Sequence, residues 1–484
     1  MSTLIQSTLI LAFTRVTNYV LLFFSPILLV RILDPATFGQ YREFVAWSMI
    51  TTSIAAFSIS SNLLYFVPRH PENTRRYVSH TALMTLFMSL LACGVLWLFG
   101  DAIRSGTSFD LLPPLSIYVF LYVNVTFLDR YWIATKQPKY VFYYSTIRTG
   151  VRLSAVIGTA WATRSIEAIV AALIGVETLR VMVVLAISRG GRLLSFGFDR
   201  RVLAEQLAFI LPLGIATSLA QVHQYVGQLV ISTQLGVVAL AVYSIASFKV
   251  PIIRMVRGAV SEAIFPDMVR QAASDRPDRL RLWKRGNVAY TFLVLPAFLL
   301  LFWYADVLIP LVFTERYVDA VPIFRVLLLM MPLETIELNS PLRAIKRTPD
   351  MLAGNLLLLG TNLLCMVIFF RWFPEHAIFG PAVGVVAGQL AQLAFLASRV
   401  LHWYRIPLHD LLKWRSQGAI WLCTMVSGLL LIVGDYVPVP ELWRIASFAL
   451  VYGAGYFVLI RLFRLEEVET LWASLCHKLR RAPA

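Results

Sequence analysis

Residues 288–302 read VAYTFLVLPAFLLLF, a run without a single charged side chain. A helix that crosses a bilayer needs about 20 mostly apolar residues, and similar runs recur along this chain of 484 residues. The hydrophobic fraction is 58% and the charged fraction is 14%, whereas soluble domains average roughly 45–50% and about 25%. The sequence therefore predicts an all-α polytopic membrane protein.

The apolar runs are bounded by charges and turn residues, and together they predict about 14 transmembrane helices. Their approximate ranges are 9–31, 39–66, 79–99, 113–135, 140–161, 166–188, 203–233, 238–265, 286–311, 321–344, 350–371, 379–401, 417–434 and 442–463. Short loops between these ranges leave no room for a sizeable soluble domain.

Two pairs of short segments indicate an internal duplication. Residues 33–41 (LDPATFGQY) match 235–243 (LGVVALAVY), and 134–138 (ATKQP) match 344–349 (AIKRTP). Matches six spans apart, in the same orientation, predict two six-helix lobes around a central cavity. The predicted domains are an N-terminal lobe over 1–190, a cytoplasmic linker over 191–202, a C-terminal lobe over 203–403, two further helices over 404–464 and a cytoplasmic tail over 465–484.

The positive charge of the chain follows the predicted topology. Its formal net charge is +16, but the basic residues punctuate the spans instead of forming one patch, so no nucleic-acid partner is expected. Loops after even-numbered spans carry the basic clusters, for example Arg75 and Arg76, Arg200 and Arg201, and Lys284 and Arg285. Because Lys and Arg collect in cytoplasmic loops, both termini are predicted to be cytoplasmic.

Charged residues inside a membrane span cost free energy, so they usually face the interior of the helix bundle or a water-filled cavity. The deep cations are Arg15, Arg148, Arg152, Arg180, Lys249, Arg254 and Arg257, and the deep acids are Glu177, Glu334 and Glu337. This excess of positive charge predicts an anionic cargo. The alternative is a set of structural ion pairs, such as Glu177 with Arg180 at a spacing of three residues.

Two stripes of neutral polar residues also favour a cavity. In the seventh span Thr217, Gln221, Gln224 and Gln228 share one helical face, and in the first span Ser7, Thr14, Asn18 and Ser25 do so. As the first spans of the two lobes, they are expected to face each other across a central cleft. The alternative is hydrogen bonding that only holds helices together.

No enzymatic motif is found. The sequence lacks a phosphate-binding GxxxxGKS/T loop, an HExxH pair and a GxSxG elbow, and its four cysteines show no metal or disulfide spacing. We therefore predict no catalytic residue, no cofactor and no metal, and expect transport to run on gradients or membrane potential. Glu334 and Glu337 are the candidate ion-coupling residues, and the competing interpretation is a static ion pair with Arg325 or Arg343.

Several short motifs carry a family resemblance. Arg31-x-Leu-Asp-Pro-x-x-Phe-Gly-x-Tyr41 and the run 243–251, continued by Phe265-Pro266, resemble the O-antigen and exopolysaccharide flippases of the multidrug/oligosaccharidyl-lipid/polysaccharide (MOP) exporter superfamily. The residues Phe13-Thr-Arg15-Val are similar to the first helix of lipid II flippases, in which an arginine faces the cavity. Two helices after the twelfth also occur in those flippases.

The resemblance implies a function and its partners. An undecaprenyl-diphosphate-linked oligosaccharide would be flipped from the cytoplasmic to the periplasmic leaflet of the bacterial inner membrane by alternating access. Its partners would be that substrate, the lipid bilayer, and polysaccharide polymerase and chain-length proteins. Two alternatives remain: a multidrug exporter, whose cationic drugs favour acids in the cavity, and a polymerase or ligase, which should carry a large periplasmic loop.

These inferences combine into one predicted substrate site. The diphosphate needs compensating charge, and arginine offers bidentate hydrogen bonds. We expect it to bind at Arg15, Arg148, Arg152, Lys249, Arg254 and Arg257. The sugars of the cargo are expected to contact Asn18, Gln221, Gln224 and Gln228.

Overall fold

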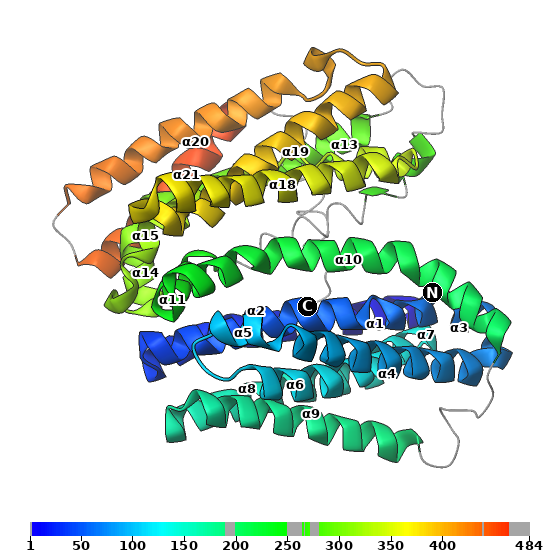
Figure 1. Cartoon of the computed structure of the whole chain (residues 1–484). Coiled ribbons are helices and arrows are strands. Elements are labelled where there is room, and N and C mark those ends of the chain that lie inside the picture. Colours follow the sequence, from blue (N-terminus) through cyan, green and yellow to red (C-terminus); the bar gives the residue numbers. More distant parts are fainter. Residues whose placement is uncertain are drawn as a thin grey trace. The chain divides into compact units, whose positions relative to one another are not determined.

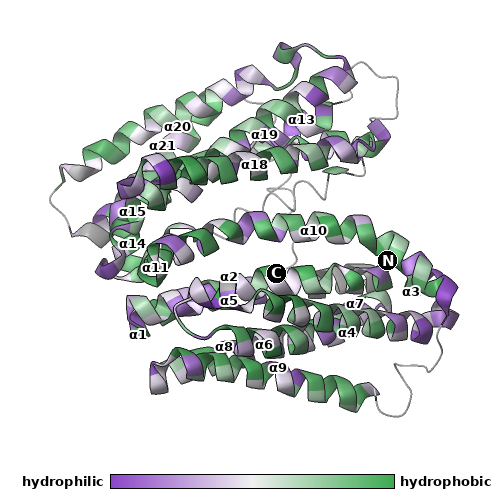
Figure 2. Ribbon diagram, viewed as in Figure 1, coloured by the Kyte–Doolittle hydropathy of each residue, from purple (hydrophilic) through white to green (hydrophobic). Residues whose placement is uncertain are grey.

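A computed structural model describes residues 2–188, 199–248, 264–265, 267–271, 280–437 and 440–463, and every regular element within them is helical. Nine of the described helices are long and apolar enough to cross a membrane, and a bent pair, Pro35–Ala56 with Ile59–Arg69, makes a tenth. Helices such as α9 and α18 are hydrophobic over most of their length (Figure 2). The predicted all-α membrane fold is confirmed, while the count of 14 stays a prediction.

The chain divides into two compact units, Met1–Ser244 and Ile245–Ala484 (Figure 1). The helices of the first unit are α1 (Ser2–Ile32), α2 (Pro35–Ala56), η1 (Ile59–Asn62), α3 (Leu63–Arg69), η2 (Pro71–Asn73), α4 (Thr74–Leu98), α5 (Gly100–Ser105), α6 (Leu112–Asn124), α7 (Phe127–Ala134), α8 (Pro138–Thr163), α9 (Ile166–Ser188) and α10 (Arg200–Leu235). Helix α11 (Val237–Ala246) spans the boundary.

In the first unit, α8 packs between α1 and α9, and α10 packs along α2 (Figure 1). The second unit contains α13 (Arg281–Trp303), α14 (Ala305–Phe313), η3 (Glu315–Tyr317), α15 (Ala320–Leu328), α16 (Met330–Glu334), α17 (Asn339–Ala344), α18 (Thr348–Trp372), η4 (Pro374–Phe379), α19 (Gly380–Tyr404), η5 (Leu408–Asp410), α20 (Trp414–Asp435) and α21 (Glu441–Leu462). Within it α18 pairs with α19, and α20 with α21.

The Leu-Asp-Pro motif has a local physical explanation. Asp34 is the N-cap of α2: its carboxylate accepts the backbone N–H groups of Ala36 at 3.0 Å and Thr37 at 3.1 Å, and Pro35 occupies the first turn. Although burial opposes the shift, these bonds and one from the Thr37 hydroxyl lower the pKa of Asp34. The motif therefore sets where the second predicted span begins.

Four predicted spans are broken instead of continuous, and one of them is 286–311, which divides into α13 and α14 at Tyr304. The chain bends by 47° between α2 and the η1–α3 segment, where Phe57 and Ser58 adopt left-handed φ angles of 41° and 54°. The span predicted over 113–135 divides into α6 and α7, and the one over 321–344 divides into α15, α16 and α17. Hydropathy alone hides most of these breaks because the interrupting residues are apolar or small, with the exception of Glu337 between α16 and α17.

The bend after α2 is held by packing against α10. The Phe57 ring lies against Gly214, where an added Cβ would come within 2.2 Å of the ring. The hydroxyls of Ser58 and Thr217 are 2.8 Å apart. The boundaries of the predicted lobes stay a prediction, and the predicted tail over 465–484 lies outside the described residues.

Candidate functional site

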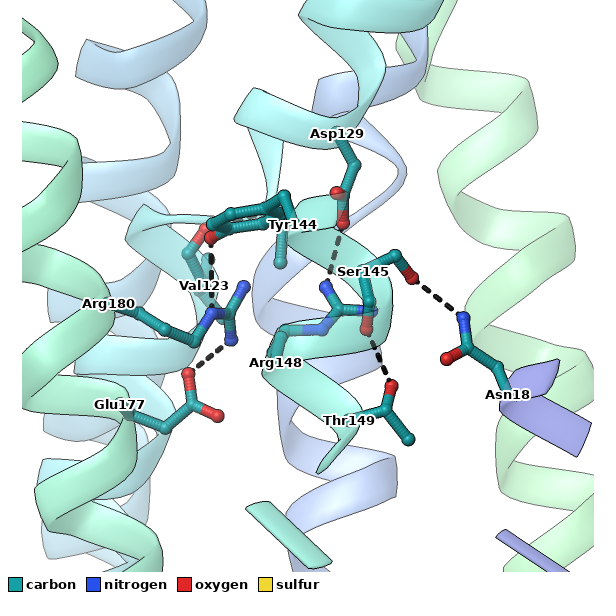
Figure 3. Close-up of polar contacts among 10 residues, drawn as sticks. Asn18, Val123, Asp129, Tyr144, Ser145, Arg148, Thr149, Glu177 and Arg180 are labelled. Atoms are coloured by element: carbon teal, nitrogen blue, oxygen red, sulfur yellow. Dashed lines mark hydrogen bonds and ion pairs between the residues drawn. The ribbon is translucent and has the colours of Figure 1, made fainter. Parts of the chain in front are cut away.

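Helix α8 carries a polar face formed by Ser145, Arg148, Thr149 and Arg152, which recur at intervals of three and four residues. The Arg148 guanidinium donates from Nη1 to Asp129 Oδ2 at 2.7 Å, which ties α8 to α7 (Figure 3). The pair is partly shielded, since the two side chains are 28% and 23% exposed. Arg148 is therefore neutralised by an acid that the sequence analysis did not count.

A second ion pair lies beside the first, on α9. Arg180 pairs with Glu177, one turn earlier, and both side chains are almost fully buried. The Arg180 Nε also donates to the Tyr144 hydroxyl of α8 at 3.2 Å (Figure 3). The pair predicted from the spacing of three residues is thus confirmed, and the α8 tyrosine links it to the Arg148 pair.

The third arginine of this region, Arg152, lies among aromatic rings. Its guanidinium carbon is 5.9 Å from the centroid of the Tyr118 ring, and Tyr118 stacks on Tyr122 at 5.7 Å. Arg180 lies 5.5 Å from the Tyr122 ring. Within the described part of the chain, Arg152 forms no ion pair. The arginine–tyrosine network is Tyr118, Tyr122, Asp129, Tyr144, Arg148, Arg152, Glu177 and Arg180.

Asn18 of α1 reaches the same face of α8. Its Nδ2 donates to Ser145 Oγ at 2.8 Å (Figure 3), while its Oδ1 is buried without a hydrogen-bond partner among the described residues. Of the predicted residues, Asn18 thus contacts the α8 face that also carries Arg148 and Arg152, although Arg148 pairs with α7 and Arg152 lies beside Tyr118 of α6.

A separate polar seam joins α2 to α10, and it is called the α2–α10 seam below. Its centre is Glu43, which is 0% exposed. The Glu43 carboxylate accepts the hydroxyl of Ser108 at 2.7 Å, the backbone N–H of Ser108 at 3.3 Å, and the hydroxyl of Ser232. No arginine or lysine in the described ranges pairs with Glu43.

The seam extends on both sides of Glu43. Arg42 donates to Gln228 Oε1 at 3.4 Å, and the Ser218 hydroxyl donates to the Ser53 carbonyl at 3.5 Å. Where α11 begins, a Cβ added to Gly39 would lie 2.0 Å from the Val237 carbonyl oxygen. Only glycine permits this approach of two backbones.

The other predicted site residues have different surroundings. Gln228 is buried in the seam, Gln221 is half-buried and Gln224 is exposed. Arg15 lies in α1, and its side chain is not among those described; Lys249, Arg254 and Arg257 lie outside the described residues. Convergence of all six cations on one cavity stays a prediction.

The candidate coupling acids lie in the interrupted tenth span of the second unit. Glu337, just before α17, accepts the Ser340 backbone N–H in the first turn of that helix at 3.1 Å. Glu334 ends α16 and has a polar partner. The alternative arginine partners lie elsewhere: Arg325 pairs with Asp306, and Arg343 stacks over Phe265. Ion coupling at these acids stays a prediction.

The charge count from sequence needs a correction in the first unit. It omitted Asp129 and Glu43 among the acids and Arg42 among the cations. With these included, the deep acids of the first unit are Glu43, Asp129 and Glu177, which leaves an excess of two positive charges over the deep cations Arg15, Arg42, Arg148, Arg152 and Arg180. Asp129 could have been found from the sequence, because it lies inside the predicted span 113–135, less than two helical turns from the cytoplasmic end of that span.

Comparisons with known proteins agree with this architecture. A family model described as polysaccharide biosynthesis protein matches residues 28–322, more than half of the chain. No curated protein matches the sequence closely enough to count as a relative.

Solved structures share the fold. The lipid II flippase MurJ in an inward closed conformation is 14% identical with a TM-score of 0.68, over 93% of this chain and 98% of that one. An inward-facing multidrug resistance MATE family transporter of the MOP superfamily is 14% identical with a TM-score of 0.59, over 80% and 93%. A mutant form of the Vibrio cholerae MATE transporter VcmN is 12% identical with a TM-score of 0.51, over 83% and 97%.

Proposed function

Because the chain belongs to the polysaccharide biosynthesis protein family matched by residues 28–322, we propose that it flips lipid-linked oligosaccharides, with an undecaprenyl diphosphate carrier, from the cytoplasmic to the periplasmic leaflet. Its fold is that of MOP superfamily transporters and flippases. The proposed location is the bacterial inner membrane, with both termini in the cytoplasm. The exported unit would be used for O-antigen or exopolysaccharide synthesis, in which polymerase and chain-length proteins would be the partners.

The observation that carries the proposal is the environment of Arg152. Two of the three arginines in the network form ion pairs with carboxylates. In the described part of the chain Arg152 lies beside aromatic rings and forms no ion pair, although Glu177 interacts with its charge at longer range. A guanidinium without a carboxylate inside a membrane protein is costly, and a diphosphate would neutralise it through bidentate hydrogen bonds.

The α2–α10 seam supports alternating access. By the predicted duplication, α2 belongs to the first lobe and α10 begins the second, so the seam joins the lobes. Ser108 lies in a loop that is predicted to be periplasmic, and its hydroxyl donates to Glu43 in the first half of α2. Ser232, near the end of α10, donates to the same carboxylate. We interpret the seam as the closed periplasmic gate, which must open when cargo is released.

Export assays in a deletion strain test the cargo site. Arg152→Ala should abolish polysaccharide export at normal expression, and Arg152→Lys should retain part of it because the charge remains without the bidentate geometry. Arg130→Ala is the matched control, since Arg130 is exposed on α7 and outside the network. Full export by Arg152→Ala would refute the role of this arginine.

Cysteine labelling tests the proposed orientation. With a reagent that does not cross membranes, Thr107→Cys and Glu315→Cys should react in intact spheroplasts, whereas Asn73→Cys and Arg347→Cys should react only after lysis. The reverse pattern would overturn the proposed direction of transport together with the positions of both termini.

A further inference from the structure

The second unit contains a cavity of about 380 Å³, separate from the residues proposed to bind cargo. It is lined by the end of α13, the start of α14, the middle of α15 and the first turn of α21. The lining residues are Phe302, Trp303, Tyr304, Asp306, Val307, Arg325 and Arg444. All of these positions lie at the end of the second unit that the charge pattern predicts to be periplasmic.

Arg325 is held in a fixed position in this cavity. Its Nε donates to the Phe302 carbonyl oxygen at 3.1 Å, and its Nη2 donates to Asp306 Oδ1 at 3.1 Å and approaches the Trp303 carbonyl oxygen at 3.5 Å. The carbonyls at the end of a helix lack partners within the helix, so Arg325 satisfies those of α13. The same bonds orient the guanidinium in the cavity wall.

Among the described residues, no such partner is found for Arg444. Its Nε is buried without a hydrogen-bond partner in the part of the chain that the structure describes. It lies in the first turn of α21, where the helix dipole disfavours a cation. A half-buried cation at the positive end of a helix, with an N–H group that donates to nothing, lowers stability unless an anion accepts that hydrogen bond and balances the charge.

We propose that this cavity binds the phosphate or diphosphate group of a lipid headgroup at the periplasmic face. Among the described lining residues, the two arginines outweigh the carboxylate of Asp306, so this part of the wall carries a net positive charge. Phe302 and Trp303, both partly exposed, are the kind of aromatic residues that lie at membrane interfaces. The site goes beyond the proposed flipping activity, because it would bind such a group whatever cargo the chain moves.

Binding experiments on the full chain test the site and distinguish its ligands. One arm measures retention of phosphatidylglycerol by native mass spectrometry after purification with mixed phosphatidylcholine and phosphatidylglycerol. The other arm measures pyrophosphate binding by calorimetry in phosphatidylcholine nanodiscs. Arg444→Gln should weaken binding about tenfold, since one charge-assisted hydrogen bond is worth about 1.4 kcal/mol or more.

Matched variants separate this site from the cargo site and from misfolding. Val307→Trp fills the cavity while keeping both arginines and should also remove binding, whereas Arg444→Lys should restore part of it. Arg461→Gln, at the exposed opposite end of α21, should leave binding unchanged in both arms. Arg152→Ala, at the cargo site in the first unit, should leave phosphatidylglycerol retention unchanged and can lower only the pyrophosphate binding that belongs to the cargo site.

The two arms lead to distinct outcomes. If Arg444→Gln and Val307→Trp lose phosphatidylglycerol retention, the ligand is a lipid headgroup. If these variants lose only pyrophosphate binding, the ligand is a soluble phosphate compound. If Arg444→Gln and Val307→Trp bind both probes as well as Arg461→Gln does, the site does not exist. None of these results depends on whether oligosaccharide export is observed.

Discussion

Glu43 and Glu177 are both buried carboxylates of the first unit, but their surroundings differ. Glu177 is paired with Arg180 on its own helix, whereas Glu43 accepts hydrogen bonds from Ser108, in the loop between α5 and α6, and from Ser232 on α10. The first arrangement needs only one helix to be complete. The second exists only while three segments of the chain are in contact.

This difference indicates different roles. An intrahelical ion pair moves with its helix, so it survives any rigid-body motion of the lobes and contributes to a permanent core. A carboxylate shared by three segments must lose partners when those segments separate. We therefore assign Glu177 to the stability of the fold and Glu43 to the balance between closed and open gates.

The largest effect is expected at the permanent pair. Arg180→Ala leaves Glu177 buried without its cation, and breaking a buried pair in this way destabilises proteins by about 3–5 kcal/mol. Thermal unfolding of the purified protein measures the loss. The double variant Glu177→Gln/Arg180→Met should recover much of the stability, because it removes both charges; equal instability of the two variants would contradict this explanation.

Glu43→Gln is expected to open the seam with less effect on overall stability. Hydrogen bonds to a charged acceptor are worth about 1.5–3 kcal/mol each, so losing the charge should raise the open fraction about tenfold or more. Ile231→Cys, fully buried on α10, reports opening by its reaction with a membrane-impermeant maleimide. Unchanged labelling in Glu43→Gln would mean that Glu43 does not control the gate.

Removal of one hydroxyl from each region sharpens the comparison further. Tyr144→Phe deletes the acceptor of the Arg180 Nε, and Ser232→Ala deletes a donor to Glu43. Each loss should cost about 1.5 kcal/mol, the lower end of the range for hydrogen bonds to charged groups. Tyr144→Phe should lower the unfolding temperature without changing labelling at position 231. Ser232→Ala should increase labelling at position 231 with little change in the unfolding temperature. Identical behaviour of the two variants would contradict the separate roles of Glu43 and Glu177.

The smallest effect is expected outside both regions. Arg347 lies between α17 and α18, where its guanidinium carbon is 3.4 Å from the Trp403 ring centroid. A cation–π contact at an exposed site is worth about 0.5–1 kcal/mol. Arg347→Ala should therefore leave export nearly unchanged in the complementation assay, and strong loss of export would show that charges outside the proposed site also govern transport.

Part of the candidate site could be predicted from the sequence. The pairing of Glu177 with Arg180 follows from their spacing of three residues on one helix, which is a local property. The polar face of α8 is local for the same reason, and so it identifies Arg148 and Arg152 as residues of one surface. The partner of Arg148 is a different matter, because Asp129 lies on another helix and its choice depends on how α7 and α8 pack.

The sequence by itself determined the membrane class and the helical fold, because long apolar runs can satisfy their backbone in a bilayer only by forming helices within each segment. It also determined the start of α2, through the Asp34 cap and Pro35. Only the tertiary structure decided that Glu43 is shared between α2, the Ser108 loop and α10, that Gly39 meets the Val237 carbonyl, and that Arg325 and Arg444 line one cavity. These contacts join residues far apart in the chain, and nothing in the local pattern of a helix specifies which neighbour its polar side chains will meet.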